Sequence, residues 1–269
     1  MVIAFSGWSD GGEAATATLS HLLNTSNDGD NLIAALESEE FYDFQVNRPL
    51  IFIDDALIRN ITWPGTQIFA LKNPHGDRDF ILVRGVEPSM KWKTFTNEIL
   101  DFAEDCEVNL VITLGAMLAD TPHSRPVPVT GTGAHPDIAQ RLKVEVSRYE
   151  GPTGILGIIS DGCVKRGIDA ISLWAAVPHY ASASPSPKAT LALINALEDF
   201  LQMSLPQGDL PVAATQWQKS VDELVAQDSD LSEYIAGLES TYDANDLPEE
   251  SGEELAREVE RYLRRHNNE

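Results

Sequence analysis

Short, continuous apolar runs alternate with helical stretches over the first 205 residues of this 269-residue chain, and this alternation constrains the fold more than any other feature. A strand that is apolar along its whole length needs cover on both faces, which a parallel sheet between two layers of helices provides. We therefore predict an α/β domain over residues 1–205, a three-layer α/β/α sandwich with a mostly parallel sheet. The runs that predict strands are 2–6, 31–36, 50–54, 67–71, 80–83, 109–114, 155–159 and 171–177. The stretches with helical spacing are 13–23, 91–105 and 189–200.

The pattern changes near Leu205, and no strand-like run follows. Apolar residues recur at helical spacing in 217–225 and 231–238, and again in a last stripe from 255 to 263. The stretch 243–254 is acidic and contains a proline and a glycine, which predicts a linker. Residues 206–269 are therefore predicted to form a helical C-terminal region with an acidic linker.

The charge balance excludes several classes of partner. The chain has 42 acidic and 19 basic residues and a net charge of −23 at pH 7, so phosphate backbones and anionic membrane surfaces are repelled. No apolar run approaches the roughly 18 residues of a membrane span. Its two cysteines and six histidines lack the spacing of a metal site or a disulfide framework. We therefore expect a cytoplasmic protein without metal or cofactor, and with neither nucleic acid nor membrane as a partner.

Residues 7–11, Gly-Trp-Ser-Asp-Gly, match the G-x-S-x-G nucleophile elbow, which places a serine between a strand and a helix. Asp161 and His179 follow in the chain order of a serine hydrolase of that fold. The same residues also fit an ordinary strand-to-helix turn in which Ser9 or Asp10 caps the helix. We favour the turn, and keep Ser9, Asp161 and His179 as candidates for catalysis.

Polar residues gather where predicted strands end. Asp120, His123 and Arg125 follow one predicted strand, and His179 follows another. Because open α/β sheets bind ligands beyond the carboxyl ends of their strands, these residues are candidates for a ligand site, with Glu150 as a further member. An acid, a base and an arginine suit a nucleoside- or phosphate-like ligand. The alternative is that these groups cap helices and pair with one another across loops.

Three aromatic residues and an arginine lie close together in residues 41–49. They are Phe41, Tyr42, Phe44 and Arg48. Aromatic residues and arginine dominate the energetics of protein interfaces, so an exposed segment of this kind predicts a contact with another protein. If the segment is buried, the same rings are simply part of the core.

Six segments together resemble the proteasome assembly chaperone 2 family, specifically its bacterial branch. They cover most of the α/β region, and their length and spacing make the match specific. The segments are 5–12, 42–49, 115–131, 147–155, 172–180 and 185–193. The resemblance implies an α/β/α core similar to that of nucleoside phosphorylases with an accessory helical region. It also implies self-association, as a trimer. Relatives in this family help to assemble proteasome rings and use no catalytic residues in that role.

We therefore expect a homo-oligomeric protein that binds other proteins or assists their assembly, with proteasome-related or other cytosolic proteins as partners and without catalysis. The alternative is an enzyme or small-molecule binder that uses the strand-end residues, or a serine hydrolase at Ser9.

Overall fold

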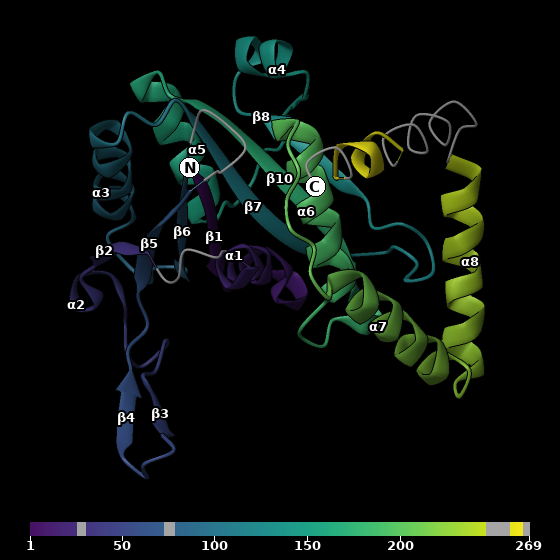
Figure 1. The fold of residues 1–269 in the computed structure, drawn as a ribbon. Coiled ribbons are helices and arrows are strands. Elements are labelled where there is room, and N and C mark those ends of the chain that lie inside the picture. Colours follow the sequence, from purple (N-terminus) through teal and green to yellow (C-terminus); the bar gives the residue numbers. More distant parts are fainter. Residues whose placement is uncertain (26–30, 73–78, 246–258, 266–269) are drawn as a thin grey trace. The chain divides into compact units, whose positions relative to one another are not determined.

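The computed structural model describes residues 1–25, 31–72, 79–245 and 259–265 (Figure 1). Eight strands form one sheet in the order β2-β5-β6-β1-β7-β10-β8-β9, and two further strands, β3 and β4, form a separate hairpin. The strands are β1 (Val2–Ser6), β2 (Leu32–Leu36), β3 (Leu50–Ile53), β4 (Arg59–Thr62), β5 (Thr66–Leu71), β6 (Phe80–Val86), β7 (Leu110–Ala119), β8 (Val129–Gly133), β9 (Glu145–Val146) and β10 (Asp169–Pro178). The α-helices are α1 (Ala14–Thr25), α2 (Ser38–Phe41), α3 (Trp92–Asp105), α4 (Pro136–Leu142), α5 (Ile155–Arg166), α6 (Pro187–Leu201), α7 (Leu210–Val225) and α8 (Ser229–Asn245).

The predicted fold class is confirmed: the sheet is mostly parallel, has helices on both sides, and is followed by C-terminal helices. Strand β1 pairs in parallel with both β6 and β7, so that Val2 lies opposite Leu82 on one side and Ile112 on the other. Strands β5 and β2 extend the sheet in antiparallel pairing beyond β6. The apolar run at the N-terminus is thus a central strand, as its lack of alternation predicts.

The chain divides into two compact units, and the first comprises residues 1–9, 26–114 and 131–172. In this unit α3 packs against α5, and α5 packs against β1. Three phenylalanine rings meet edge to face in its core, with centroids 5.6 Å apart for Phe5 and Phe95 and 5.2 Å apart for Phe41 and Phe95. Such aromatic pairs stabilise a core beyond the area that they bury.

The second unit comprises residues 10–25, 115–130 and 173–269. Within it α6 packs against both α1 and α7, and the apolar side chains of α6 that face inward, among them Leu193 and Leu197, are fully buried. The predicted domain boundary near Leu205 lies inside this unit, so the C-terminal helices belong with α1 and α6 rather than to a unit of their own. Most of the predicted acidic linker lies outside the described residues.

The prediction of a strand over residues 155–159 is wrong, because these residues open helix α5. Buried positions in α5 include Ile155, Ile159 and Cys163, which is the spacing of a helix face. A run of five apolar residues does not distinguish a buried strand from the start of a buried helix. The helix ends at Gly167, whose φ of 73° gives a left-handed C-cap. Asp161, which that predicted strand would have placed just beyond its end, therefore lies within a helix.

The helices and the acidic, histidine and cysteine side chains of the described residues bear on membrane and metal binding. No helix in these ranges combines the length and the apolar character that crossing a membrane requires. The same residues contain no group of three or more histidine, cysteine, aspartate or glutamate side chains that could hold a metal ion.

Candidate functional site

The turn after β1 is organised around Asp10, which caps helix α1. One carboxylate oxygen, Oδ1, accepts hydrogen bonds from the backbone N–H groups of Ala15 (2.8 Å) and Thr16 (3.3 Å), and Oδ2 accepts one from the Thr16 hydroxyl. These bonds satisfy N–H groups that the first turn of a helix leaves without a partner. Burial raises the pKa of Asp10, and the same hydrogen bonds oppose that rise. Of the two predicted caps, Asp10 and not Ser9 is the one that the structure forms.

Ser9 has none of the contacts that an activated nucleophile needs. Its side chain is only 4% exposed, and within the described residues its Oγ has no hydrogen-bond partner. The other two candidates are engaged elsewhere: Asp161 forms an ion pair with Lys165 one turn along α5, and Nδ1 of His179 lies 3.2 Å from Oδ1 of Asp120. Because a catalytic serine depends on a base within hydrogen-bond reach, the contacts of Ser9 do not support a hydrolase.

Substitutions of Asp10 and Ser9 test whether these residues cap helix α1 or provide a catalytic nucleophile. We expect Asp10→Ala to lower the free energy of unfolding by about 1 kcal/mol, because α1 loses its N-cap. Ser9→Ala should change it by less than about 0.5 kcal/mol, since it removes a buried hydroxyl that has no partner. Denaturant unfolding of both variants measures this difference. Labelling of wild-type Ser9 by a fluorophosphonate would contradict the assignment.

His123 is the buried centre of a polar cluster in the second unit. Its side chain is 3% exposed, and both ring nitrogens are bonded: Nδ1 lies 2.9 Å from the Tyr180 hydroxyl, and Nε2 lies 2.9 Å from Oδ1 of Asp222 on α7. The backbone N–H of His123 also donates to the Tyr180 hydroxyl, at 2.7 Å. The ring is therefore held between η2, a 3-10 turn formed by His179–Ala181, and helix α7.

Arg125 joins the same loop to helix α8. Its Nε and one terminal nitrogen donate to the two carboxylate oxygens of Asp243, at 2.7 and 2.8 Å. A second carboxylate, that of Glu239, lies 3.5 Å from the guanidinium and also accepts a hydrogen bond from Ser124. The bond from Arg125 lowers the pKa of Asp243. The sequence suggested Asp120 or Glu150 as the partner of Arg125, whereas the structure pairs it with acids of α8.

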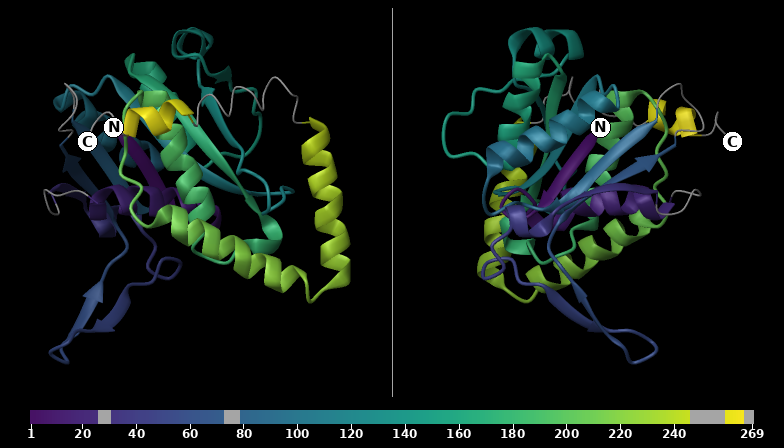
Figure 2. Two further views of the ribbon diagram at one scale, coloured as in Figure 1. Left: turned by 45° about the vertical axis from the view of Figure 1, so that its right-hand side comes forward. Right: turned by 90° about the vertical axis from the view of Figure 1, so that its left-hand side faces the viewer.

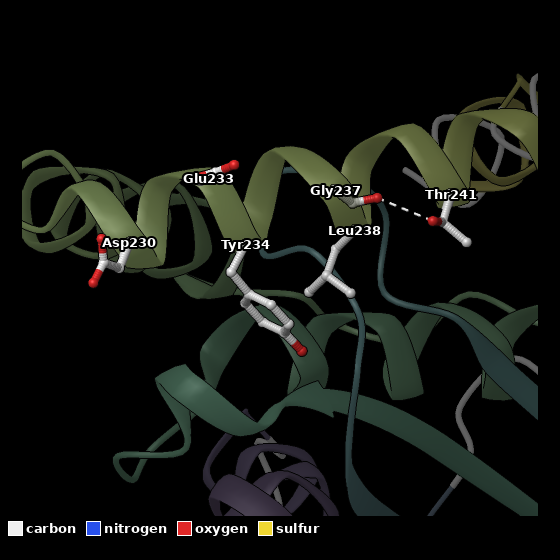
Figure 3. Close-up of a pocket in the computed structure, with 6 residues that line it drawn as sticks. All are labelled: Asp230, Glu233, Tyr234, Gly237, Leu238 and Thr241. Atoms are coloured by element: carbon white, nitrogen blue, oxygen red, sulfur yellow. Dashed lines mark hydrogen bonds between the residues drawn. The ribbon is translucent and has the colours of Figure 1, made fainter.

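A shallow groove of about 560 Å³ lies along one face of α8 (Figure 3). Tyr234 forms one side of it, and its hydroxyl donates to Oδ1 of Asp120 at 3.1 Å while its ring meets that of His179 edge to face. Gly237 lies in the groove, and a Cβ at this position would meet no other atom within 4 Å. The lining residues are Asp230, Glu233, Tyr234, Gly237, Leu238 and Thr241. Asp120 and His179 therefore lie next to the groove through their contacts with Tyr234.

Lys188 belongs to the same cluster, although the sequence did not indicate it. Its ammonium donates to the backbone carbonyl of His123 and to the side-chain oxygen of Gln218 (2.7 Å). Burial lowers the pKa of Lys188 to about 8. Tyr180 and Asp222 were also missed. Only Tyr180 had a signal in the sequence, because it directly follows His179.

Glu150, the remaining ligand candidate, lies in the first unit, in the exposed loop before α5. The other strand-end candidates, Asp120, His123, Arg125 and His179, belong to the second unit, and each contacts a side chain of that unit. Of these four, only Asp120 and His179 pair with each other; His123 bonds Tyr180 and Asp222, and Arg125 bonds Asp243. A role in ligand binding stays a prediction for all five.

The aromatic segment of the first unit divides into a buried and an exposed part. Phe41 and Tyr42 are core residues rather than interface anchors: Phe41 packs on Phe95, and the Tyr42 hydroxyl is 2.8 Å from Oγ1 of Thr66. Burial raises the pKa of Tyr42 to about 12. Phe44 is half-buried and its ring lies 4.8 Å from that of Trp63, while Arg48 is exposed.

The exposed part continues into what we call the apolar hairpin, residues 46–63. It contains β3 and β4 and extends away from strands β5 and β6 of the first unit (Figures 1 and 2). Nine large apolar side chains in it are each half or more exposed, an unusual concentration for a soluble surface. They are Val46, Leu50, Ile51, Phe52, Ile53, Leu57, Ile58, Ile61 and Trp63. The sequence reads 50–54 as a strand but does not show that the strand is uncovered.

The fold and these sites define an α/β protein with a mostly parallel sheet, helices on both sides of it and an exposed apolar hairpin. Comparison with known proteins identifies its family. The sequence model of the PAC2 family matches residues 4–225. The chain belongs to the PAC2 family.

Solved structures agree with this assignment. A PAC2 family protein from Streptomyces avermitilis is 50% identical, with a TM-score of 0.81, over 87% of this chain and 98% of that one. A proteasome-assembly chaperone homologue from Mycobacterium tuberculosis is 44% identical, with a TM-score of 0.78 and the same coverage. An archaeal proteasome activator from Pyrococcus furiosus, 19% identical over 83% of this chain and 91% of that one, shares the fold with a TM-score of 0.65. No curated protein matches the chain.

Proposed function

We propose that this protein is a homo-oligomeric assembly factor that binds other proteins without catalysing a reaction. The observation that carries the proposal is the apolar hairpin, because nine exposed apolar side chains on two strands need cover. An isolated two-stranded hairpin is at best marginally stable in water, so a binding partner also stabilises it. The resemblance to proteasome-assembly proteins supports cytosolic proteasome subunits as clients of this protein.

Both faces of the hairpin are available for contacts. Ile51 lies opposite Ile61 on one face, and Leu50 lies opposite Thr62 on the other, because neighbouring residues of a strand point to opposite sides. A neighbour on each face is possible in a closed ring of three copies, whereas a two-fold dimer covers one face. We therefore propose a trimer as the assembled state.

The contacts of the strand-end residues support the absence of catalysis. His123 is bonded through both ring nitrogens, and Arg125 through two nitrogens to one carboxylate. Because the His123 side chain is only 3% exposed and its nitrogens already bond Tyr180 and Asp222, a substrate has little access to the ring. The alternative of a nucleoside- or phosphate-like ligand rests on Asp120 and His179 beside the α8 groove, which are the more exposed members of the set.

Sedimentation equilibrium tests the proposal. At about 10 µM we expect a mass close to three times the 29.5 kDa of one chain. The double variant Ile51→Thr/Ile61→Thr keeps β-branched residues in both strands but removes apolar surface from one face, and it should shift the distribution toward the monomer.

Val212→Thr is the control, since Val212 is even more exposed than Ile51 and Ile61 but lies on α7, far along the chain from the hairpin. The control should assemble like the wild type. A single-chain mass at every concentration would rule out self-association. A separate experiment tests the proposal that proteasome subunits are the clients. The protein should raise the yield of assembled rings from separately purified proteasome subunits.

A further inference from the structure

The tip of the apolar hairpin is a closely bonded turn built on Asp54. Oδ1 of Asp54 accepts hydrogen bonds from the backbone N–H groups of Ala56 (3.0 Å) and Ile58 (2.8 Å), and Oδ2 accepts one from the side chain of Asn60 (3.0 Å). The backbone closes the turn as well, with bonds between Leu57 N–H and the Asp54 carbonyl and between Asp54 N–H and the Ile58 carbonyl. The hydrogen bonds to its carboxylate, chiefly the one from the Ile58 N–H, lower the pKa of Asp54. The tip therefore has one defined conformation.

Leu57 lies in this turn in an unfavourable backbone conformation. Its φ is 61°, in the left-handed region, which glycine and asparagine enter far more readily than leucine does. Its side chain is also 85% exposed. Strain and exposure of an apolar side chain both disfavour leucine here. The hydrogen bonds of the Asp54 turn hold the backbone in place, but they leave the leucine side chain in solvent. Residues held in such conformations cluster at binding sites, where the strain belongs to the function.

We propose that Leu57 is the anchor by which the hairpin of one copy binds a second copy of this chain, an inference that rests on the proposed self-association. A fixed turn that presents one apolar side chain loses little conformational freedom on binding. Leucine in this position buries its side chain in the neighbouring copy, while the hydrogen bonds of Asp54 keep it directed outward. Burial of the Leu57 side chain in a second copy then offsets the backbone strain, which nothing in a single copy explains.

Charge favours a second copy as the occupant. The whole chain carries a net charge of −23, so two copies repel each other over most of their surface. The apolar hairpin, by contrast, has two arginines, Arg48 and Arg59, and two aspartates, Asp54 and Asp55, and is neutral. Like-charged copies meet with the least repulsion at such a segment. Its nine exposed apolar side chains supply the non-polar surface that such a contact buries.

The variant Leu57→Gly tests the inference, because it removes the anchor and at the same time relieves the backbone strain. We expect the dissociation constant for self-association to rise at least tenfold. At nanomolar concentration, where the chain is monomeric, the melting temperature followed by tryptophan fluorescence should be unchanged or higher. Leu57→Asn, which also tolerates the left-handed region, should behave in the same way. Leu224→Ala, which truncates an exposed leucine on α7, is the control and should assemble normally.

The outcomes separate this inference from the proposed function. If the wild type assembles and Leu57→Gly assembles equally well, Leu57 is not the anchor, and the proposed self-association stands. If the wild type stays monomeric, both the Leu57 anchor and the proposed self-association are wrong. The proposed binding of proteasome subunits is then tested by the ring-assembly yield alone. Loss of assembly by Leu57→Gly with an intact melting transition supports the anchor.

Discussion

Removing the side chain of Arg265 should destabilise the protein by about 3 kcal/mol, because it leaves a buried carboxylate without its charged partner. The side chain of Glu198 on α6 is 1% exposed. Its carboxylate accepts hydrogen bonds from Arg265, with Nε at 3.1 Å, and from the backbone N–H of Leu205 at 2.9 Å. For a chain of this size, Arg265→Ala should lower the melting temperature by roughly 6–12 °C.

A double-mutant cycle shows whether the loss comes from the buried charge. Glu198→Gln replaces the carboxylate by a neutral amide, so adding Arg265→Ala to that variant should cost much less than Arg265→Ala alone. Arg264→Ala serves as the control within residues 259–265, since Arg264 donates to the backbone carbonyl of Glu198 (3.0 Å) rather than to its carboxylate. Equal melting temperatures for wild type and Arg265→Ala would show that the ion pair between Arg265 and Glu198 of α6 does not form in solution.

His123→Ala should lower the free energy of unfolding by a similar amount, about 3 kcal/mol. The substitution removes a buried ring, which leaves a cavity, and it deprives the Tyr180 hydroxyl and Asp222 of a partner. Thermal melts measure the effect. Asp222→Asn is the matched control: its side chain is half-exposed, so it should cost less than about 1 kcal/mol.

The same melts decide between a structural and a ligand-binding His123. We expect inorganic phosphate and a panel of nucleotides to leave the melting temperatures of wild type and His123→Ala unchanged, because the ring nitrogens are already bonded. A ligand that stabilises the wild type and not the variant would contradict the structural role and favour the small-molecule alternative.

The strands and helices of the α/β region follow from local patterns, and the prediction was accurate where those patterns are long. Helix α3 and strands β1 and β10 lie close to their predicted ranges, whereas β7 continues to Ala119, five residues beyond its predicted end. The error over 155–159 arose because five apolar residues fit a strand and a helix equally well. The short elements β4, β8, β9 and α4 were missed for the related reason that a few residues carry too little periodicity.

The members of the polar cluster were predictable, but their partners were not. Asp120, His123, Arg125 and His179 stand out because they follow buried strands. Their partners on α7 and α8 are remote in sequence: Asp222 lies 99 residues from His123, and Asp243 lies 118 residues from Arg125. On their helices these acids look like any solvated residue. Only packing of the helices against the loop reveals that they bind it.

The sequence by itself determined the fold class, the net negative charge, and the residues that lie at the ends of the central strands, because hydrophobic period and charge are local properties of the chain. The tertiary structure alone decided which apolar residues are covered. Phe41 and Tyr42 lie in the core, whereas Leu50, Ile53 and Leu57, only a few residues further along, lie in solvent. The hydrophobicity of a residue gives the free energy that it would gain from burial. Whether it is buried depends on whether another part of the molecule packs against it.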